Sequence, residues 1–252
     1  MPGSRLAKEN VMKEFTAQRT VGQIVAEKAS RSRVFEQYRI DFCCGGKQTL
    51  AEACAAKGIS VDVLASRLEE SDKASTGADT DLRSLGLSEL TDYIERTFHA
   101  SLRDLLPRLT QLTTKVAEVH GATDARLAEL AGIFAQFRSE MEQHAGKEET
   151  ILFPMIRQLE SATTMPAFHC GTVANPIRVM MADHDGAGAA LARMRELTDG
   201  FAAPAHACNT YRAMLDGLAQ LEDETHRHVH TENEILFPDS IAREKTYSIT
   251  AA

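Results

Sequence analysis

Hydrophobic residues recur every three or four positions through the later part of the chain, which is the spacing of a helix that buries one face. The pattern covers four stretches, at residues 88–116, 127–152, 175–201 and 211–235. Ser88 is suited to cap the first helix, and Asn175 is a suitable cap before Pro176 at the first helical position of the third. Four amphipathic helices with fairly short connections predict an up-down-up-down four-helix bundle.

A shorter and more broken pattern precedes this bundle. Residues 21–71 contain three short helical pieces, and a further helix is predicted over residues 47–57, closed by Gly58. Ser, Asp, Thr, Ala and Gly dominate residues 71–86, a composition typical of a linker. We therefore predict an all-α protein with a small helical cysteine-containing domain at residues 1–70, a linker at 71–86 and the bundle at 87–252.

One motif occurs twice and interrupts the apolar faces of the second and fourth helices. His144 and Glu148 stand four residues apart before Ile-Leu-Phe-Pro, and the arrangement returns 84 residues later (228 − 144) at His228 and Glu232. Residues four apart project from the same face of a helix, so each imidazole and carboxylate can reach one centre. The proline after each copy is expected to end its helix, because it lacks an N–H and clashes with the preceding turn.

Two further histidines lie on or beside the inward faces of the first and third helices. His99 precedes His144 by 45 residues and His184 precedes His228 by 44, so each half of the bundle supplies one His and one His-x-x-x-Glu. An unmetallated core would be a poor place for two carboxylates, whose burial without a cation costs several kcal/mol or forces protonation. The sequence therefore favours a metal centre over a set of core histidines.

The donor types indicate which metal is bound. A structural zinc takes four ligands, usually with sulfur, whereas this pattern offers two symmetric sets of nitrogen and oxygen donors. Imidazole with carboxylate suits iron or manganese, and iron is our prediction. Two irons sharing bridging carboxylates would keep positions open for water, oxide or a diatomic ligand. The predicted metal ligands are His99, His144, Glu148, His184, His228 and Glu232.

The remaining histidines are not expected to bind metal. His226 and His230 flank His228 at two-residue offsets, which turns them away from the centre and towards solvent. His120 lies in the turn after the first helix, and His169 and His206 fall in loops.

Adjacent Cys43 and Cys44 are the second candidate site. They precede the helix predicted from Lys47, whose dipole and positive charge would stabilise a thiolate. Neighbouring side chains diverge, so the pair is not expected to chelate one tetrahedral metal. Two interpretations stay open: a buried pair in a small domain, or thiols that handle iron, NO or the metal cluster of a partner.

Composition narrows the functional classes. Of the 252 residues, 43% are hydrophobic, enough for a packed core, and a net charge of −8 disfavours nucleic acid and anionic membranes as partners. No apolar run approaches the roughly 18 residues of a membrane span, and residues 1–20 lack the compact apolar core expected of a secretion signal. Five cysteines do not form a disulfide framework. We expect a soluble, cytoplasmic protein.

These motifs resemble a known family. Residues 87–242 resemble a hemerythrin-like domain, and Val21-Gly-x-Ile-Val with Ile40-Asp-Phe-Cys-Cys-Gly-Gly resembles the short cysteine domain of the RIC (YtfE- and ScdA-type) di-iron proteins that repair iron–sulfur clusters. The resemblance implies a non-haem di-iron centre, oxo- and carboxylate-bridged, with the four histidines as nitrogen ligands and Glu148 and Glu232 as bridges. It also implies action on clusters damaged by nitrosative or oxidative stress, by supplying iron or by reacting with NO.

The same resemblance suggests damaged iron–sulfur proteins or cluster scaffold proteins as partners, with NO and O2 as small ligands, and is compatible with a homodimer. Whether an NO reductase-type activity makes the protein an enzyme stays open. Oxygen-carrying hemerythrins have a further His where this chain has Gly188, and end with His-x-x-x-x-Asp, so reversible O2 storage is disfavoured. The alternatives are an O2 or NO sensor, or a thiol redox protein that uses Cys43 and Cys44.

Overall fold

The computed structural model describes residues 15–74 and 81–250, and these are helical apart from turns and loops. No strand occurs in the described ranges, where Thr20 and Thr49 form an isolated bridge, so the all-α prediction is confirmed. Contacts divide the chain into two units. The first comprises Met1–Leu85 together with Val229–Leu236, and the second comprises Gly86–His228 with Phe237–Ala252.

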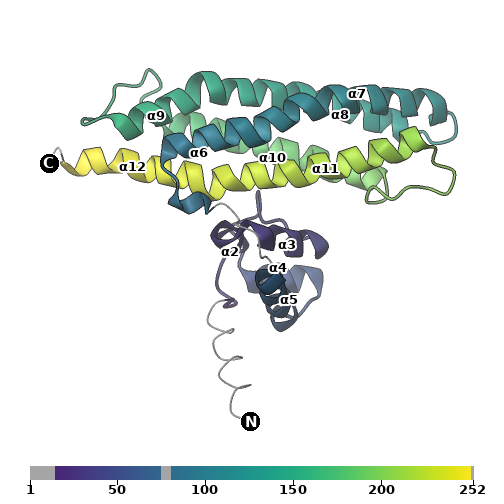
Figure 1. Ribbon diagram of the computed structural model, residues 1–252, viewed down its shortest axis with the longest axis horizontal. Coiled ribbons are helices and arrows are strands. Elements are labelled where there is room, and N and C mark those ends of the chain that lie inside the picture. Colours follow the sequence, from purple (N-terminus) through teal and green to yellow (C-terminus); the bar gives the residue numbers. More distant parts are fainter. Residues whose placement is uncertain (1–14, 75–80, 251–252) are drawn as a thin grey trace, which may run out of the picture. The chain divides into compact units, whose positions relative to one another are not determined.

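The first unit is built from short helices (Figure 1). They are α2 (Val21–Glu27), η1 (Ala29–Arg31), α3 (Ser32–Gln37), α4 (Leu50–Lys57), α5 (Val61–Ala74) and η2 (Leu82–Ser84). Thr49 and Glu52 form a reciprocal capping box at the start of α4, and Gly58 closes that helix at φ 67°. Because this cap fixes the start at Leu50, the predicted start at Lys47 is wrong by three residues.

The predicted linker at residues 71–86 is only partly irregular. Helix α5 continues to Ala74, and the short helix η2 lies at Leu82–Ser84. Residues 75–80 of the expected linker lie outside the described residues. Asp72, inside the expected linker, bonds the buried guanidinium of Arg31, which explains why the helix persists there.

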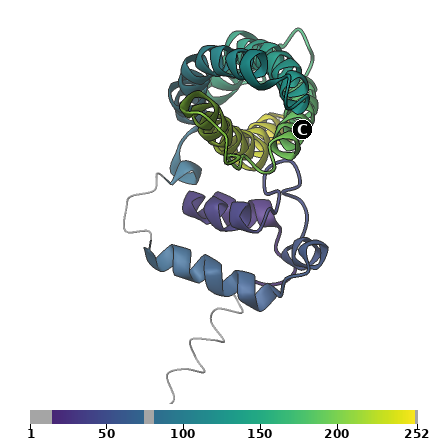
Figure 2. The ribbon, with the colours of Figure 1, turned by 90° about the vertical axis from the view of Figure 1, so that its right-hand side faces the viewer.

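Four long helical rods make up the bundle, and the fourth rod includes Val229–Leu236, which is grouped with the first unit. They are α6 (Leu87–Ile94), η3 (Glu95–His99) and α7 (Ala100–His120); α8 (Arg126–Lys147), η4 (Glu148–Leu152) and α9 (Phe153–Ser161); α10 (Ala174–Leu197); and α11 (Asn209–Thr231), η5 (Glu232–Leu236) and α12 (Phe237–Thr250). Successive rods run in opposite directions, and Figure 2 shows them arranged around one axis. The up-down-up-down prediction is therefore confirmed.

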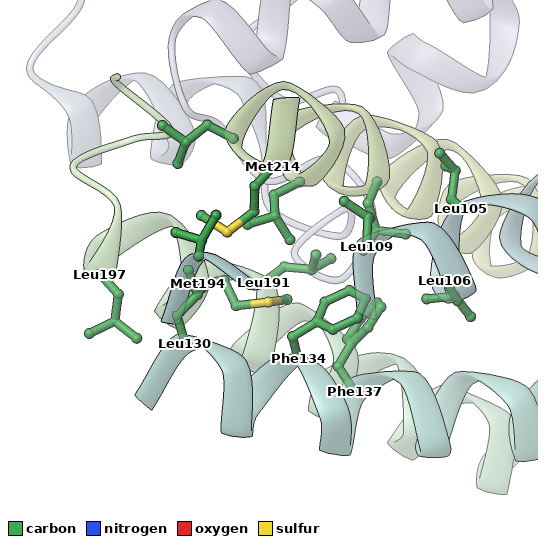
Figure 3. Packing of buried hydrophobic residues seen from close by; sticks show 14 of the residues in the cluster. Leu105, Leu106, Leu109, Leu130, Phe134, Phe137, Leu191, Met194, Leu197 and Met214 are labelled. Carbon is green, nitrogen blue, oxygen red and sulfur yellow. The ribbon is translucent and has the colours of Figure 1, made fainter. Parts of the chain in front are cut away.

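Aliphatic and aromatic side chains fill one end of the bundle. Phe134 and Phe137 of α8 are at most 1% exposed and pack in the same cluster as Leu109 of α7 and Leu191 and Met194 of α10 (Figure 3). Burial of such side chains contributes about 1.5–3 kcal/mol each. This packing fixes the rods, and with them the positions of the polar groups further along the axis.

Three rods contain a single π-helical turn: η3, η4 and η5. In η4 the Phe153 N–H bonds to the carbonyl of Glu148, five residues back. This wider turn carries the chain into α9, with Pro154 in its first turn, where a missing N–H is tolerated. The prediction that Pro154 and Pro238 end their helices is therefore wrong, since α9 and α12 continue through them.

The 84-residue repeat extends to the ends of the rods. Glu160 accepts hydrogen bonds from the backbone N–H groups of Leu87 and Ser88 at 2.7 and 2.9 Å, at the start of α6. Glu244, 84 residues later, accepts one from Val173 at 2.9 Å, at the start of α10. Each carboxylate satisfies N–H groups that a helix start leaves open and interacts favourably with the helix dipole. Gly86, rather than the predicted Ser88, is the N-cap of α6.

Candidate metal centre

The structure brings all six predicted ligands together. Their donor atoms form two groups, and within each group all donor atoms lie within 4.8 Å of one another. The first group is His99, Glu148, His228 and Glu232; the second is His144, Glu148, His184 and Glu232. Both carboxylates are fully buried, and each of the four histidines is 1% exposed. Glu148 and Glu232 belong to both groups, which is the arrangement that two neighbouring cations with shared carboxylates require.

The imidazoles point their Nε2 atoms at the shared carboxylate. The Nε2 atoms of His99 and His144 lie 3.2 and 3.3 Å from Oε2 of Glu148, and that of His228 lies 3.9 Å away. The Nε2 atom of His184 is 3.2 Å from that of His144. Four nitrogen donors and a carboxylate oxygen therefore converge on one small volume.

Two carboxylates outside the ligand set orient two of these imidazoles. Glu149 accepts a hydrogen bond from Nδ1 of His99 at 2.7 Å and is itself held by Arg103. Burial alone would raise the pKa of Glu149, but the hydrogen bonds from His99 and Arg103 outweigh it and lower the pKa. Since an ionised carboxylate only accepts, the proton of His99 lies on Nδ1, which leaves the Nε2 lone pair directed at the centre.

Asp183 has the same role for His144. Its Oδ2 lies 3.4 Å from Nδ1 of His144 and 2.6 Å from Nζ of Lys147. Burial opposes ionisation here too, but Lys147 and His144 lower the pKa of Asp183. The sequence pattern did not identify either orienting carboxylate as a site residue. Each stands next in sequence to a predicted ligand, a signal that could have identified them.

Aromatic rings hold the histidines in place. Phe153 stacks on His99 with 5.8 Å between ring centroids and 9° between planes, and Phe237 stacks on His184 at 5.9 Å and 5°. Both are the Phe of an Ile-Leu-Phe-Pro motif, and the stacking explains why a phenylalanine follows each His-x-x-x-Glu. The π-helical turns place these phenylalanines against the ligands while keeping Glu148 directed inward.

The donor set fits a bound cation. With their protons on Nδ1, neutral His99 and His144 direct Nε2 lone pairs at a carboxylate oxygen little more than 3 Å away. Lone pairs facing lone pairs repel unless a positive charge lies between them. Six nitrogen and oxygen donors without sulfur match the ligands preferred by iron or manganese better than those of structural zinc.

A cavity of about 310 Å³ opens beside the centre. It is lined by Met141, His144, Lys147, Asp183 and Ala187, among others. Lys147 and Asp183 thus line the cavity as an ion pair, and Asp183 also bonds Nδ1 of His144. This cavity gives a water-sized molecule or a hydrated ion a polar approach to His144.

The five histidines that were not predicted as ligands lie outside the centre, but one of them is not where the sequence predicts. His226 is half-buried, but the prediction that His230 faces solvent is wrong: it is 5% exposed, its Nδ1 donates to the Phe42 carbonyl at 3.2 Å, and burial lowers its pKa to about 4. Helical periodicity correctly turns His230 away from the centre, but there it packs against Phe42 within the first unit instead of facing solvent. His120, His169 and His206 lie outside both donor groups.

The two adjacent cysteines are not at a helix start. Cys43 is 4% exposed, Cys44 is half-buried, and α4 begins only at Leu50. A hydrogen bond to Cys44, burial and the charge of Asp41 raise the pKa of Cys43 well above its usual value. The expectation that a helix dipole stabilises a thiolate here is therefore wrong for Cys43.

Comparison with known proteins agrees with the fold and the centre. The profile of the Hemerythrin HHE cation binding domain matches residues 90–240, and that of ScdA_N, Domain of Unknown function (DUF542), matches residues 17–72. The rods and the inward histidines and glutamates thus define a hemerythrin-type cation-binding bundle. The Iron-sulfur cluster repair protein YtfE of Enterobacter sp. (strain 638) is 36% identical over 224 residues, 89% of this chain and 97% of the relative.

Proteins with the same name from Escherichia coli O81 (strain ED1a) and Escherichia fergusonii give the same identity and coverage. The chain belongs to the YtfE family of iron–sulfur cluster repair proteins. Among the described residues, no helix is both long enough and apolar enough to span a membrane.

Proposed function

We propose that this protein repairs iron–sulfur clusters damaged by nitrosative or oxidative stress, by means of an oxo- and carboxylate-bridged di-iron centre. The observation that carries the proposal is the pair of donor groups sharing Glu148 and Glu232. Each group supplies two imidazoles and the same two carboxylates. The names of the relatives, iron–sulfur cluster repair proteins at 36% identity, supply the process.

Iron bound at this centre would supply electrons to NO or peroxide, and would itself be cargo for a damaged cluster. The residues of the chain control that chemistry. The Phe153 and Phe237 rings keep His99 and His184 from rotating, and Glu149 and Asp183 hold protons on Nδ1 of His99 and His144. Both shared carboxylates are fully buried and so lie away from bulk water.

Iron is expected to be releasable from this centre. Gly188, one turn after His184 in α10, has no side chain and therefore no donor atom, so the third rod supplies a single imidazole. A coordination position left open accommodates a small ligand and weakens the hold on the metal. The cavity beside His144, with a lysine and an aspartate in its lining, offers the route for exchange.

Damaged iron–sulfur proteins, or the scaffold proteins on which clusters are assembled, are the proposed partners. The cytoplasm is the proposed compartment, since all five cysteines are free thiols and a reducing environment keeps them so. NO is the proposed small-molecule ligand, and reduction of NO at the centre is a proposed accompanying activity. A homodimer of this chain is the proposed assembly.

The test is repair of a [4Fe–4S] dehydratase that has been inactivated by NO. Iron-loaded protein should restore its activity, and His184→Ala should not, because it removes one of four imidazoles. His169→Ala, the same change at an exposed loop histidine, is the matched control and should repair normally. If the loaded protein neither restores the dehydratase nor consumes NO, the proposal fails. Reversible binding of gas without iron loss would instead support a sensor.

A further inference from the structure

The loop that contains the two adjacent cysteines holds a second group of potential metal ligands. Sγ of Cys43 lies 3.8 Å from Sγ of Cys44 and 3.3 Å from Oδ1 of Asp41. The three donor atoms all lie within 4.8 Å of one another. The expectation that neighbouring cysteine side chains diverge is therefore wrong here. It holds for an extended strand, where successive side chains point to opposite faces, but these residues lie in consecutive bends.

The spacing of these atoms matches a tetrahedral metal. A divalent ion with metal–sulfur bonds of about 2.3 Å places its two thiolate sulfurs about 3.8 Å apart, and a carboxylate oxygen at about 2.0 Å lies about 3.5 Å from each sulfur. The Cys43–Cys44 and Cys43–Asp41 separations of 3.8 and 3.3 Å agree with two of these three edges to within about 0.2 Å, and the third edge, from Cys44 to Asp41, is within 4.8 Å. An ion could enter between the three groups with little movement of the backbone.

Hydrogen bonds hold the loop in this shape. Oδ1 of Asp41 accepts from the backbone N–H groups of Cys43 and Cys44 at 2.9 and 3.0 Å, and Oδ2 accepts from that of Gly45 at 2.9 Å. Within the same unit, Nδ2 of Asn233 donates to the Cys43 carbonyl at 3.2 Å. The peptide groups around Cys43 are thus fixed from both sides, and preorganised donors bind a metal with less loss of entropy.

The chemistry of the donors also favours a cation. The Asp41 carboxylate oxygen lies 3.3 Å from Sγ of Cys43, so the cluster contains an acidic oxygen donor beside its two sulfurs. A divalent ion would be the largest charge in such a site and would deprotonate the thiols that bind it. Cys44 is half-buried, so the cluster is open to an ion from solvent on that side.

We propose that Asp41, Cys43 and Cys44 bind one thiophilic divalent ion of the zinc class, with the fourth coordination position left open. This site differs from the His and Glu centre in every donor residue and in containing sulfur. It goes beyond the proposed repair function and does not depend on it. With three protein ligands and one exchangeable position, the geometry is that of a site that passes on or exchanges its ion, not of a closed structural zinc.

Cobalt(II) is the probe, because thiolate-to-cobalt charge transfer gives near-ultraviolet bands that imidazole and carboxylate ligands do not give. The reduced full-length protein, titrated with cobalt(II), should show these bands together with the visible bands of a tetrahedral ion. Cys43→Ser and Cys44→Ser should each abolish the charge-transfer bands and weaken this binding by more than roughly 100-fold. Cys208→Ser, the same change at an exposed cysteine, and His184→Ala should both retain them.

A second measurement uses the unaltered protein and so does not depend on a variant folding. Zinc should slow alkylation of Cys43 and Cys44 by iodoacetamide, mapped by mass spectrometry, and leave that of Cys208 unchanged. The proposal is overturned if the wild-type protein gives no charge-transfer bands or if zinc protects none of these thiols. Bands that survive in both loop variants, or that disappear in Cys208→Ser, would also overturn it. Visible cobalt bands without charge-transfer bands, lost in His184→Ala, would show that only the His and Glu centre takes the ion.

Discussion

Replacing Glu149 by Gln tests whether a carboxylate outside the ligand set controls how firmly the centre holds iron. Glu149 bonds Nδ1 of His99 at 2.7 Å, and Arg103 keeps it ionised and in place. Glutamine keeps the length of the side chain but loses the charge, and its amide can turn an N–H towards the ring. His99 would then lose the acceptor that keeps its proton on Nδ1 and its Nε2 lone pair directed at the metal.

The expected effect is large because the bond is short and mostly buried. Removing such a partner weakens metal binding by about 10–100-fold, which corresponds to about 1.4–2.7 kcal/mol. Glu149→Gln should lie near the upper end of this range. Asp183→Asn should lie near the lower end, because its oxygen is 3.4 Å from Nδ1 of His144 and also bonds Lys147.

Transfer of ferrous iron from the loaded protein to a coloured chelator measures the effect without reference to repair activity. Glu149→Gln should release iron faster than Asp183→Asn, and both faster than the wild type. Glu142→Gln is the matched control, since Glu142 is an exposed carboxylate on α8 that pairs with Arg138. If Glu149→Gln releases iron at the rate of the wild type, or no faster than the control, the orienting bond has no energetic role and the reasoning is refuted.

Three further predictions concern stability. Phe153→Leu removes the ring stacked on His99 and should lower the free energy of unfolding of the metal-free protein by roughly 1–3 kcal/mol in urea titrations; an unchanged midpoint would contradict it. Glu160→Gln weakens the cap at the start of α6 and should cost about 1 kcal/mol, seen as a melting temperature about 2–4 °C lower, whereas a rise would exclude a capping role. The third prediction concerns the ion pair of Asp72 with Arg31: burial alone would raise the pKa of Asp72, but Arg31 lowers it below the value in the unfolded chain. The ion pair therefore stabilises the fold fully above the unfolded pKa, and this stabilisation is lost as the pH falls through the folded pKa. Asp72→Asn should therefore cost about 1–3 kcal/mol at pH 7 and progressively less as the pH falls below the unfolded pKa of an aspartate, and a cost that does not change with pH would refute the assignment.

The six ligands could be predicted from the sequence because helical geometry converts their spacing into position. His144 and Glu148 replace apolar residues at a spacing that keeps one face inward, and the structure places both at the centre. The repeat then made the other half predictable. No tertiary information was needed, since each rod contributes its donors through its own periodicity.

The π-helical turns could not be predicted in the same way. A turn such as Glu148–Leu152 widens by one residue because the packing of Phe153 against His99 favours it, and no local preference of the sequence signals this. The motif alone therefore predicts a helix end at its proline, although the wider turn carries the helix past it. Packing of His230 against Phe42 was missed for a similar reason, because periodicity records only one buried face of a helix.

The repetition from Glu160 to Glu244 has a consequence for how such a centre can be assembled. One half of the bundle, residues 86–162, supplies to the centre one lone imidazole, His99, and one His-x-x-x-Glu, together with the stacking Phe153 and the capping Glu160. Two identical copies of such a helical hairpin, related by a twofold axis, would supply the same six donors and the same two caps. The arrangement is thus the single-chain equivalent of a symmetric dimer, and a single polypeptide allows the two halves to carry different residues at matching positions, as Glu149 and Asn233 do.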